Sequence, residues 1–126
     1  DAECNEGAVW EAAMFAAHHR LCNLTAVIDC NGQQALGKTA DVLQMEPQTE
    51  RWQSFGWRPI EVDGHDPVAL QAAFAEAVRG ETPSVVLART SAGKGVSFME
   101  DKVEWHYLPM TDEQYASALN EVAADR

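Results

Sequence analysis

Residues 24–32 read Leu-Thr-Ala-Val-Ile-Asp-Cys-Asn-Gly, an apolar and partly β-branched run that ends in polar residues. A continuous run of this kind, residues 24–29, is typical of a strand that lies inside a parallel sheet. Two similar runs follow at residues 57–62 and 83–89, the second with Val85, Val86 and Leu87 as its buried part. The three runs predict three strands of one sheet.

Helical patterns separate these strands. The first, residues 7–21, is apolar nearly all round, so we expect it to be buried on several sides, and Asn5 is its predicted N-cap. Further helices are predicted at residues 47–55, at 68–79 after a cap at Asp66, and at 112–124, with loops at 32–45 and 90–110. Strands that alternate with helices predict an α/β fold with a mostly parallel sheet flanked by helices.

The chain is strongly acidic, with a formal net charge of −11 over 126 residues. This charge argues against nucleic-acid binding, because phosphate contacts need Lys and Arg. No apolar stretch approaches the roughly 18 residues of a membrane span, so no membrane association is expected. Three cysteines without C-x-x-C spacing argue against a disulfide framework and favour the cytoplasm. A zinc site built from Cys4, Cys30 and the adjacent His18 and His19 matches no structural-zinc spacing.

Polar residues gather where the predicted strands end. Asp1 lies at the head of the first helix, Asn31 follows the first strand, and residues 63–65 and 90–95 follow the other two. Ligands of parallel sheets bind beyond the carboxyl ends of the strands, so these residues are candidates for one site. Carboxylate and amide oxygens suit Mg²⁺ that carries a diphosphate.

The predicted domain is single but partial, covering residues 1–126. A sheet of three strands leaves an edge open to pairing with another chain, and the first helix is too apolar to face water. We expect a missing N-terminal part or partner chains to cover this surface.

Several stretches resemble the transketolase family of thiamine-diphosphate enzymes. Asp1 and Asn31 match the acidic and amide ends of the family's diphosphate motif, which begins Gly-Asp-Gly. The stretches that resemble transketolases more specifically are residues 5–13, 17–21, 55–57 with 62–66, and 93–100 with 105–106. The resemblance is closest to the smaller, N-terminal subunit of split transketolases, in the second half of its diphosphate-binding domain.

The resemblance implies a metal and cofactor site. The side chains of Asp1 and Asn31 and the backbone carbonyl of Gln33 would hold Mg²⁺ (or Ca²⁺). Residues implied to bind thiamine diphosphate are Asp1, Ala2, Glu3, Asn31, Gln33 and Lys94. Taken singly, Asp1 is also compatible with a helix cap, Asn31 with an Asx turn at Gly32, and Lys94 with a solvated lysine.

The resemblance also implies catalytic roles. Glu6 and Glu11 resemble acidic residues near the family's dimer interface that couple two active sites, although Glu6 is equally compatible with ordinary charge at a helix N-terminus. Glu11 lies in an apolar stretch, where a buried carboxylate needs a partner. His106 resembles the histidine of the loop that closes over the cofactor; the alternative is a surface histidine packed on Trp105. His65 is predicted to be structural.

The implied activity is transfer of a two-carbon ketol unit from a ketose phosphate to an aldehyde acceptor. The pyrimidine-binding domain, with the glutamate that activates the cofactor, is not in this sequence. The expected partners are therefore the missing N-terminal portion and a pyrimidine-binding C-terminal subunit, in a hetero-oligomer. Because Ala2 stands where the motif has Gly, a specialised relative with an unusual acceptor, including one on a carrier protein, is a further possibility.

Two alternatives stay open at this stage. One is another thiamine-diphosphate enzyme, such as a 2-oxoacid dehydrogenase subunit or a deoxyxylulose-phosphate synthase. The other is a non-catalytic scaffold subunit that retains the fold. A Rossmann dehydrogenase is a poor fit, because no G-x-G-x-x-G follows a predicted strand.

Overall fold

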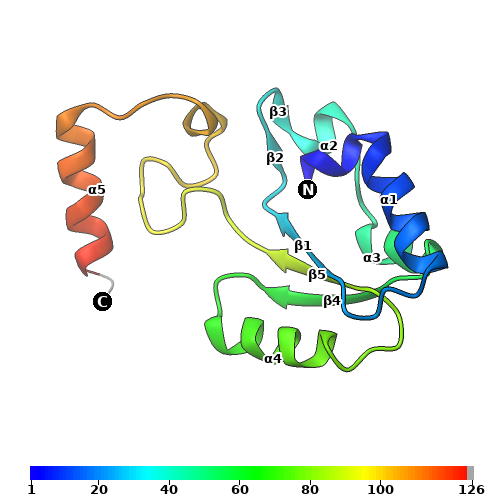
Figure 1. Cartoon of the computed structure of the whole chain (residues 1–126). Helices are drawn as coiled ribbons and strands as arrows, with labels where there is room; N and C mark the ends of the chain where they lie inside the picture. The colour runs from blue at the N-terminus through cyan, green and yellow to red at the C-terminus, as the bar shows by residue number, and fades with distance from the viewer. Residues whose placement is uncertain (125–126) are drawn as a thin grey trace.

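A computed structural model describes residues 1–124 and has a three-stranded parallel sheet at its centre (Figure 1). The strand order is β1-β5-β4, with β1 at Thr25–Cys30, β5 at Ser84–Arg89 and β4 at Arg58–Asp63. Both edge strands run parallel to β5 and in the same register, since Thr25 and Arg58 each pair with Ser84. The predicted α/β fold is confirmed, and the carboxyl ends of all three strands lie at one edge.

The remaining elements surround this sheet. They are η1 (Ala2–Asn5), α1 (Gly7–His18), β2 (Gln33–Gln34), β3 (Gly37–Lys38), α2 (Thr39–Val42), α3 (Gln48–Ser54), α4 (Pro67–Ala77), η2 (Val103–His106) and α5 (Asp112–Ala124). The Asp66 cap of α4 is confirmed, because its Oδ1 accepts from the main-chain N–H groups of Val68 at 2.8 Å and Ala69 at 3.1 Å. No helix within the described residues is both long and apolar enough to cross a membrane.

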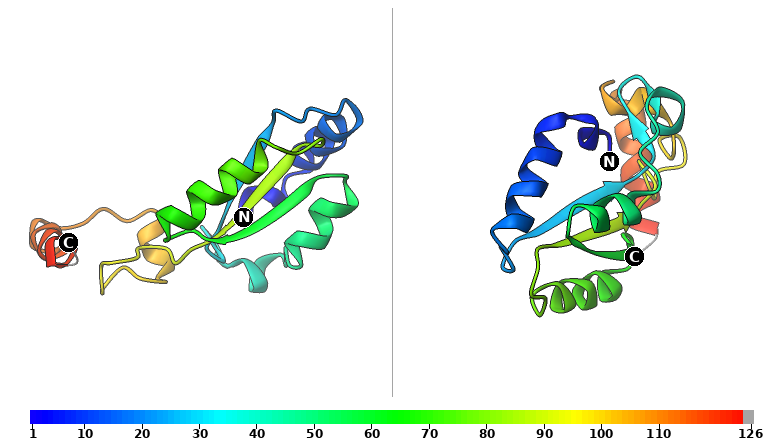
Figure 2. Two further views of the ribbon diagram at one scale, coloured as in Figure 1. Left: turned by 90° about the horizontal axis from the view of Figure 1, so that it is seen from below. Right: turned by 90° about the vertical axis from the view of Figure 1, so that its right-hand side faces the viewer.

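The main core lies between the sheet and the helices α1 and α3, whereas α4 covers the opposite face (Figure 2). Tryptophans fill it: the Trp52 ring centroid lies 5.2 Å from that of Trp10 and 5.0 Å from that of Trp57. The Trp57 indole N–H donates to the Ala13 carbonyl at 2.9 Å. Indole groups therefore both fill the core and satisfy a buried carbonyl of α1.

The central strand matches the sequence prediction, but the first strand does not. The side chains of Val85, Val86 and Leu87 are fully buried in β5. Strand β1 is an edge strand, and Val27 on it is 53% exposed. The prediction of a buried first strand is wrong for this chain, because among residues 1–124 only β5 pairs with β1.

Helix α1 also differs from the prediction. Of its side chains only Ala13 and Ala16 are buried, whereas Met14 is 53% and Phe15 61% exposed. The prediction that it is buried on several sides is wrong, since the described residues cover one side only. The N-cap is Glu6 rather than Asn5, because residues 2–5 already form the 3-10 helix η1.

The two predicted loops contain regular structure. Residues 32–45 hold the β2–β3 ladder and the short helix α2, and Gly32 and Gly37 adopt positive φ angles there. Residues 90–110 include η2, and α5 follows at a distance from the sheet (Figure 1). Helix α5 is attached to the preceding loop through Glu121, which accepts from the Ser97 main-chain N–H at 2.6 Å.

Candidate functional site

A cavity of about 390 Å³ opens beside the carboxyl end of β1. Its lining residues are Asp1, Ala2, Glu3, Asp29, Asn31 and His106. The structure therefore brings together the two predicted side-chain ligands, two further predicted cofactor residues and the predicted catalytic histidine. They come from three segments: the turn before α1, the end of β1, and η2.

Asp1 is held by the main chain around it. Its main-chain nitrogen donates to the Asp29 carbonyl at 2.7 Å, and its Oδ2 accepts from the Gly32 N–H at 2.9 Å. Its Oδ1 is buried and has no hydrogen-bond partner among the described residues. An unsatisfied buried carboxylate oxygen is unfavourable, so the position suits a cation or a donor.

The Asn31 amide is fixed at both ends. Its Oδ1 accepts from the Gln33 N–H at 2.8 Å, and its Nδ2 donates to Asp29 Oδ2 at 3.2 Å. The predicted Asx turn is thus present: it runs through Gly32 and closes on the Gln33 N–H. The turn does not exclude metal binding, because an amide oxygen has a second lone pair.

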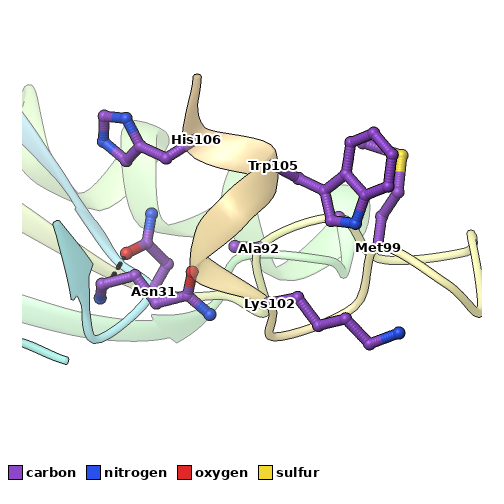
Figure 3. A pocket seen from close by; sticks show the side chains of 8 residues that line it. Asn31, Ala92, Met99, Lys102, Trp105 and His106 are labelled. Carbon is purple, nitrogen blue, oxygen red and sulfur yellow. Dashed lines mark hydrogen bonds between the residues drawn. The ribbon is translucent and has the colours of Figure 1, made fainter. Parts of the chain in front are cut away.

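A smaller cavity of about 90 Å³ adjoins the first and is walled by the loop after β5 (Figure 3). Its lining residues are Asn31, Gln33, Ala92, Gly93, Met99, Lys102, Trp105 and His106. Trp105 anchors this wall, because its indole N–H donates to the Phe98 carbonyl at 2.9 Å and its ring packs on Phe98 at 5.3 Å. His106 lines both cavities and is exposed, so its imidazole faces the space where a ligand would lie.

Of the two lysines in this loop, the structure brings the unexpected one to the site. Lys94 lines neither cavity described above, and its Nζ lies 3.9 Å from a Glu100 carboxylate oxygen. Lys102 lines the smaller cavity. Sequence reasoning missed Lys102, whose only signal was its position four residues before His106 in the same loop. The role assigned to Lys94 stays a prediction that this geometry does not favour.

Sequence reasoning also missed Asp29 and Thr90. Asp29 accepts from Asn31 and, through its other oxygen, from the Thr90 hydroxyl. Asp29 looked like the last residue of a strand, and its position two residues before Asn31 was the available signal. Thr90 belongs to the predicted site loop but was not singled out.

The remaining predicted residues lie outside the cavities. Glu6 and Glu11 are exposed, and Glu11 shares the uncovered face of α1 with Met14 and Phe15. The expectation that Glu11 is a buried carboxylate is wrong for the described chain, while its interface role stays a prediction. His65 accepts from the Ser91 main-chain N–H through Nε2 at 2.8 Å, as expected of a structural histidine.

The chemistry of the donors favours oxygen ligation over zinc. Residues 1–124 contain no group of three or more His, Cys, Asp and Glu side chains placed to hold a metal ion. Burial raises the pKa of the Cys4 and Cys30 thiols, which disfavours the thiolate form that zinc binds. The predicted ligands Asp1, Asn31 and the Gln33 backbone would instead offer one carboxylate, one amide and one carbonyl oxygen, a combination that suits a hard cation.

Comparison with known proteins shows the family of domains that this sequence matches. The sequence matches the family described as the thiamine diphosphate-binding domain of transketolase over residues 1–125. It is 39% identical over 123 residues to the 6-deoxy-6-sulfo-D-fructose transketolase subunit SqwG of Clostridium sp. (strain MSTE9), covering 97% of this chain and 45% of that protein. It is 37% identical over 124 residues to one subunit of the apulose-4-phosphate transketolase of Phocaeicola vulgatus, covering 98% and 44%. The chain thus spans less than half the length of these relatives.

Solved structures with a similar fold are also transketolases. A transketolase of Campylobacter jejuni superposes with a TM-score of 0.91 at 24% identity, over 98% of this chain and 19% of that one. A complex of the Pichia stipitis enzyme with sedoheptulose-7-phosphate gives a TM-score of 0.69 at 28% identity, over 95% and 21%. The first likeness concerns the fold alone.

Proposed function

Because this chain belongs to the family of transketolase thiamine diphosphate-binding domains, we propose that it holds the Mg²⁺-diphosphate end of the cofactor within a larger transketolase. The enzyme would transfer a two-carbon ketol unit from a ketose phosphate to an aldehyde acceptor. The observation that carries this proposal is the buried Asp1 Oδ1, which has no hydrogen-bond partner among residues 1–124 and belongs to the cavity that Asn31 also lines.

The residues present fit the metal. Asp1 offers an oxygen that lacks a partner among the described residues, and Asn31 offers an amide oxygen held in place by the Gln33 N–H. The Gln33 backbone carbonyl is the third proposed protein ligand, with diphosphate and water oxygens completing the shell. Ala2 and Glu3 line the same cavity and would lie beside the diphosphate. When bound, thiamine diphosphate supplies the nucleophilic carbon that accepts the ketol unit.

The loop wall would contact the diphosphate and the sugar substrate. His106 lines both cavities, so its imidazole can donate to a diphosphate oxygen or exchange a proton with a sugar hydroxyl. Lys102 adds a positive charge to the smaller cavity, where it would attract phosphate. Trp105 fixes the position of this wall through its bond to Phe98.

The chain would act only in an assembly. Its uncovered α1 face carries Glu11 beside two exposed apolar side chains, Met14 and Phe15, which suits contact with another protein chain. We assign Glu6 and Glu11 to that contact as coupling residues. The partners would be the rest of the diphosphate-binding domain and a subunit with the pyrimidine-binding domain, in a cytoplasmic hetero-oligomer.

The relatives guide the substrate class. Two proteins of similar sequence are named for transketolase action on a sulfo-sugar and a sugar phosphate. We assign this chain to an enzyme of sugar metabolism with a phosphorylated or similarly anionic ketose as donor. The acceptor is left as an aldehyde, free or on a carrier protein. These relatives disfavour both a 2-oxoacid dehydrogenase and a scaffold role.

The test is a transfer assay on the chain in complex with the subunits that co-purify with it. A panel of ketose phosphate donors and aldose acceptors is incubated with thiamine diphosphate and Mg²⁺, and products are followed by mass spectrometry. We expect an acceptor lengthened by a C₂H₄O₂ unit that requires both the cofactor and the metal. Release of carbon dioxide from a 2-oxoacid without such transfer would contradict the proposal.

A further inference from the structure

We propose that Asp29, backed by Thr90 and Gly64, is a positioning residue that sets the direction of the Asn31 amide and so of its metal-binding oxygen. The inference deepens the proposed function and rests on it, because the amide matters most if it holds the metal. Asp29 need not touch the ion for this role.

The Asn31 amide lies between two groups of opposite character. Its Nδ2 donates to Asp29 Oδ2 at 3.2 Å, and its Oδ1 accepts from the Gln33 N–H at 2.8 Å. If the amide turned over, its NH₂ would meet the Gln33 N–H and its oxygen would meet a carboxylate, so both contacts would become repulsive. Asp29 therefore selects one of the two amide orientations.

Asp29 is itself fixed from the neighbouring strand. Its Oδ1 accepts from the Thr90 hydroxyl, and the Thr90 main-chain N–H reaches the Cys30 carbonyl at 3.4 Å. Thr90 directly follows β5, so the carboxylate at the end of β1 is held by the end of the central strand. A carboxylate with two donors on separate oxygens has little rotational freedom.

Gly64 holds the Thr90 side chain from behind. A Cβ on Gly64 would lie 2.4 Å from Thr90 Cγ2 and 3.0 Å from the Arg89 carbonyl. The Gly64 N–H donates to that same carbonyl at 2.8 Å. The turn after β4 thus lies directly against Thr90, and the absence of a side chain at Gly64 leaves room for the threonine methyl group. With the methyl placed there, the hydroxyl faces Asp29.

Asp29 also lines the larger cavity, so a direct electrostatic role must be separated from positioning. The variant Asp29→Asn does this. Its side-chain oxygen can accept from Asn31 while its NH₂ donates to the Thr90 hydroxyl oxygen, which keeps both hydrogen bonds and removes the charge. Asp29→Ala removes both bonds. Thr90→Val and Thr90→Ser form a second pair that removes or keeps the hydroxyl.

The first measurement needs no cofactor. In the ¹⁵N spectrum of the full chain, the Asn31 side-chain NH₂ signals are assigned by their loss in Asn31→Asp. We expect them to shift in Asp29→Ala and Thr90→Val and to stay near the wild-type position in Thr90→Ser. Unchanged signals in Asp29→Ala would overturn the inference whether or not the cofactor binds.

The second measurement is Mg²⁺ affinity in the presence of thiamine diphosphate, on the chain with its co-purifying subunits. Loss of an outer residue that orients a ligand typically weakens metal binding by about 10–100-fold, which we expect for Asp29→Ala. The Mg²⁺ affinity of Asp29→Asn should stay within about threefold of the wild-type affinity. In a chain that already carries Asn31→Ala, adding Asp29→Ala should weaken Mg²⁺ binding by less than about a further twofold, since the two residues act as one unit. Equal losses in Asp29→Asn and Asp29→Ala, or additive losses with Asn31→Ala, would overturn positioning. Failure of the wild type to bind would count against the proposed function instead.

Discussion

The two walls of the candidate site are built differently. The strand-end wall, with Asp1, Asp29 and Asn31, is held by hydrogen bonds to the main chain and to neighbouring strands. The loop wall, with Lys102 and His106, follows 3-10 and irregular backbone and is anchored mainly through Trp105. The end of the site that we propose to hold the metal is therefore preorganised by the sheet, whereas the end with His106 depends on a loop.

This difference follows from where each wall originates. Parallel strands in one register end at the same level, so side chains just beyond them meet without further support. A loop has no such frame, and functional groups on loops depend on a few anchors. Changes in one wall should therefore leave the other intact.

The largest expected effect on turnover comes from the loop wall. His106→Ala should lower turnover of the assembled enzyme by about 100-fold, because a positioned acid or base contributes about 10²–10⁴-fold. Its affinity for Mg²⁺ with thiamine diphosphate should stay unchanged, since the metal is assigned to the other wall. Steady-state kinetics and calorimetric titration measure the two effects. Glu81→Ala, at an exposed position in the bend before β5, is the control. A weakened metal affinity in His106→Ala would show that the two walls are not independent.

A second test targets the backbone of the loop wall. A Cβ on Gly93 would lie 2.8 Å from the Met99 main chain, whereas one on Gly95 would meet nothing within 4 Å. Both glycines have positive φ, so Gly95→Ala carries the same type of backbone strain without the clash. We expect Gly93→Ala to cost about 1–3 kcal/mol more than Gly95→Ala in unfolding free energy, because the added methyl group must displace the Met99 main chain.

Denaturant unfolding measures this difference, and turnover is recorded in parallel. Gly93→Ala should lower turnover more than Mg²⁺ affinity, because the displaced segment carries the loop wall. Equal destabilisation by the two substitutions would show that the Met99 contact does not constrain the loop.

The smallest expected effects separate the two lysines of the loop. Lys102→Met should raise the KM for a phosphorylated donor by about 10-fold, since a hydrogen bond to a charged group contributes about 1.5–3 kcal/mol. Lys94→Met should change it by less than about twofold, because an exposed pair with Glu100 contributes little. The opposite ranking would favour the role that the sequence alone suggests for Lys94.

Local signals made much of the fold predictable. The apolar run of β5 and the Asp66 cap of α4 depend on neighbouring residues, and both were found close to the predicted positions. The exposure of α1 and β1 was not predictable, because an apolar pattern shows which residues favour burial and not whether the described residues cover them. Asn5 failed as a cap because a 3-10 helix precedes α1, which the residue type alone does not reveal.

Only part of the site was predictable, because some of its residues follow a sequence motif and others meet only in the folded chain. Asp1 and Asn31 follow a known spacing, and the structure places both at one cavity. The bond from Asp29 to Thr90 joins residues 61 positions apart, so only the parallel pairing of β1 with β5 brings them together. Lys102 lines the smaller cavity and Lys94 does not, because of the path of the loop. The positive φ angles at Gly93 and Gly95 help to set this path.

The most direct test of the central claim is calorimetric titration of thiamine diphosphate, with and without Mg²⁺, into the chain bound to its co-purifying subunits. We predict that thiamine diphosphate binds only when Mg²⁺ is present. Asp1→Ala should weaken this binding by about 100-fold or more, because loss of a residue that only orients a metal ligand already weakens binding by up to about 100-fold. Glu81→Ala, which removes an exposed carboxylate in the bend before β5, should retain the affinity. Binding that is independent of Mg²⁺, or equally strong in Asp1→Ala and the wild type, would contradict the assignment of the metal to the strand-end wall.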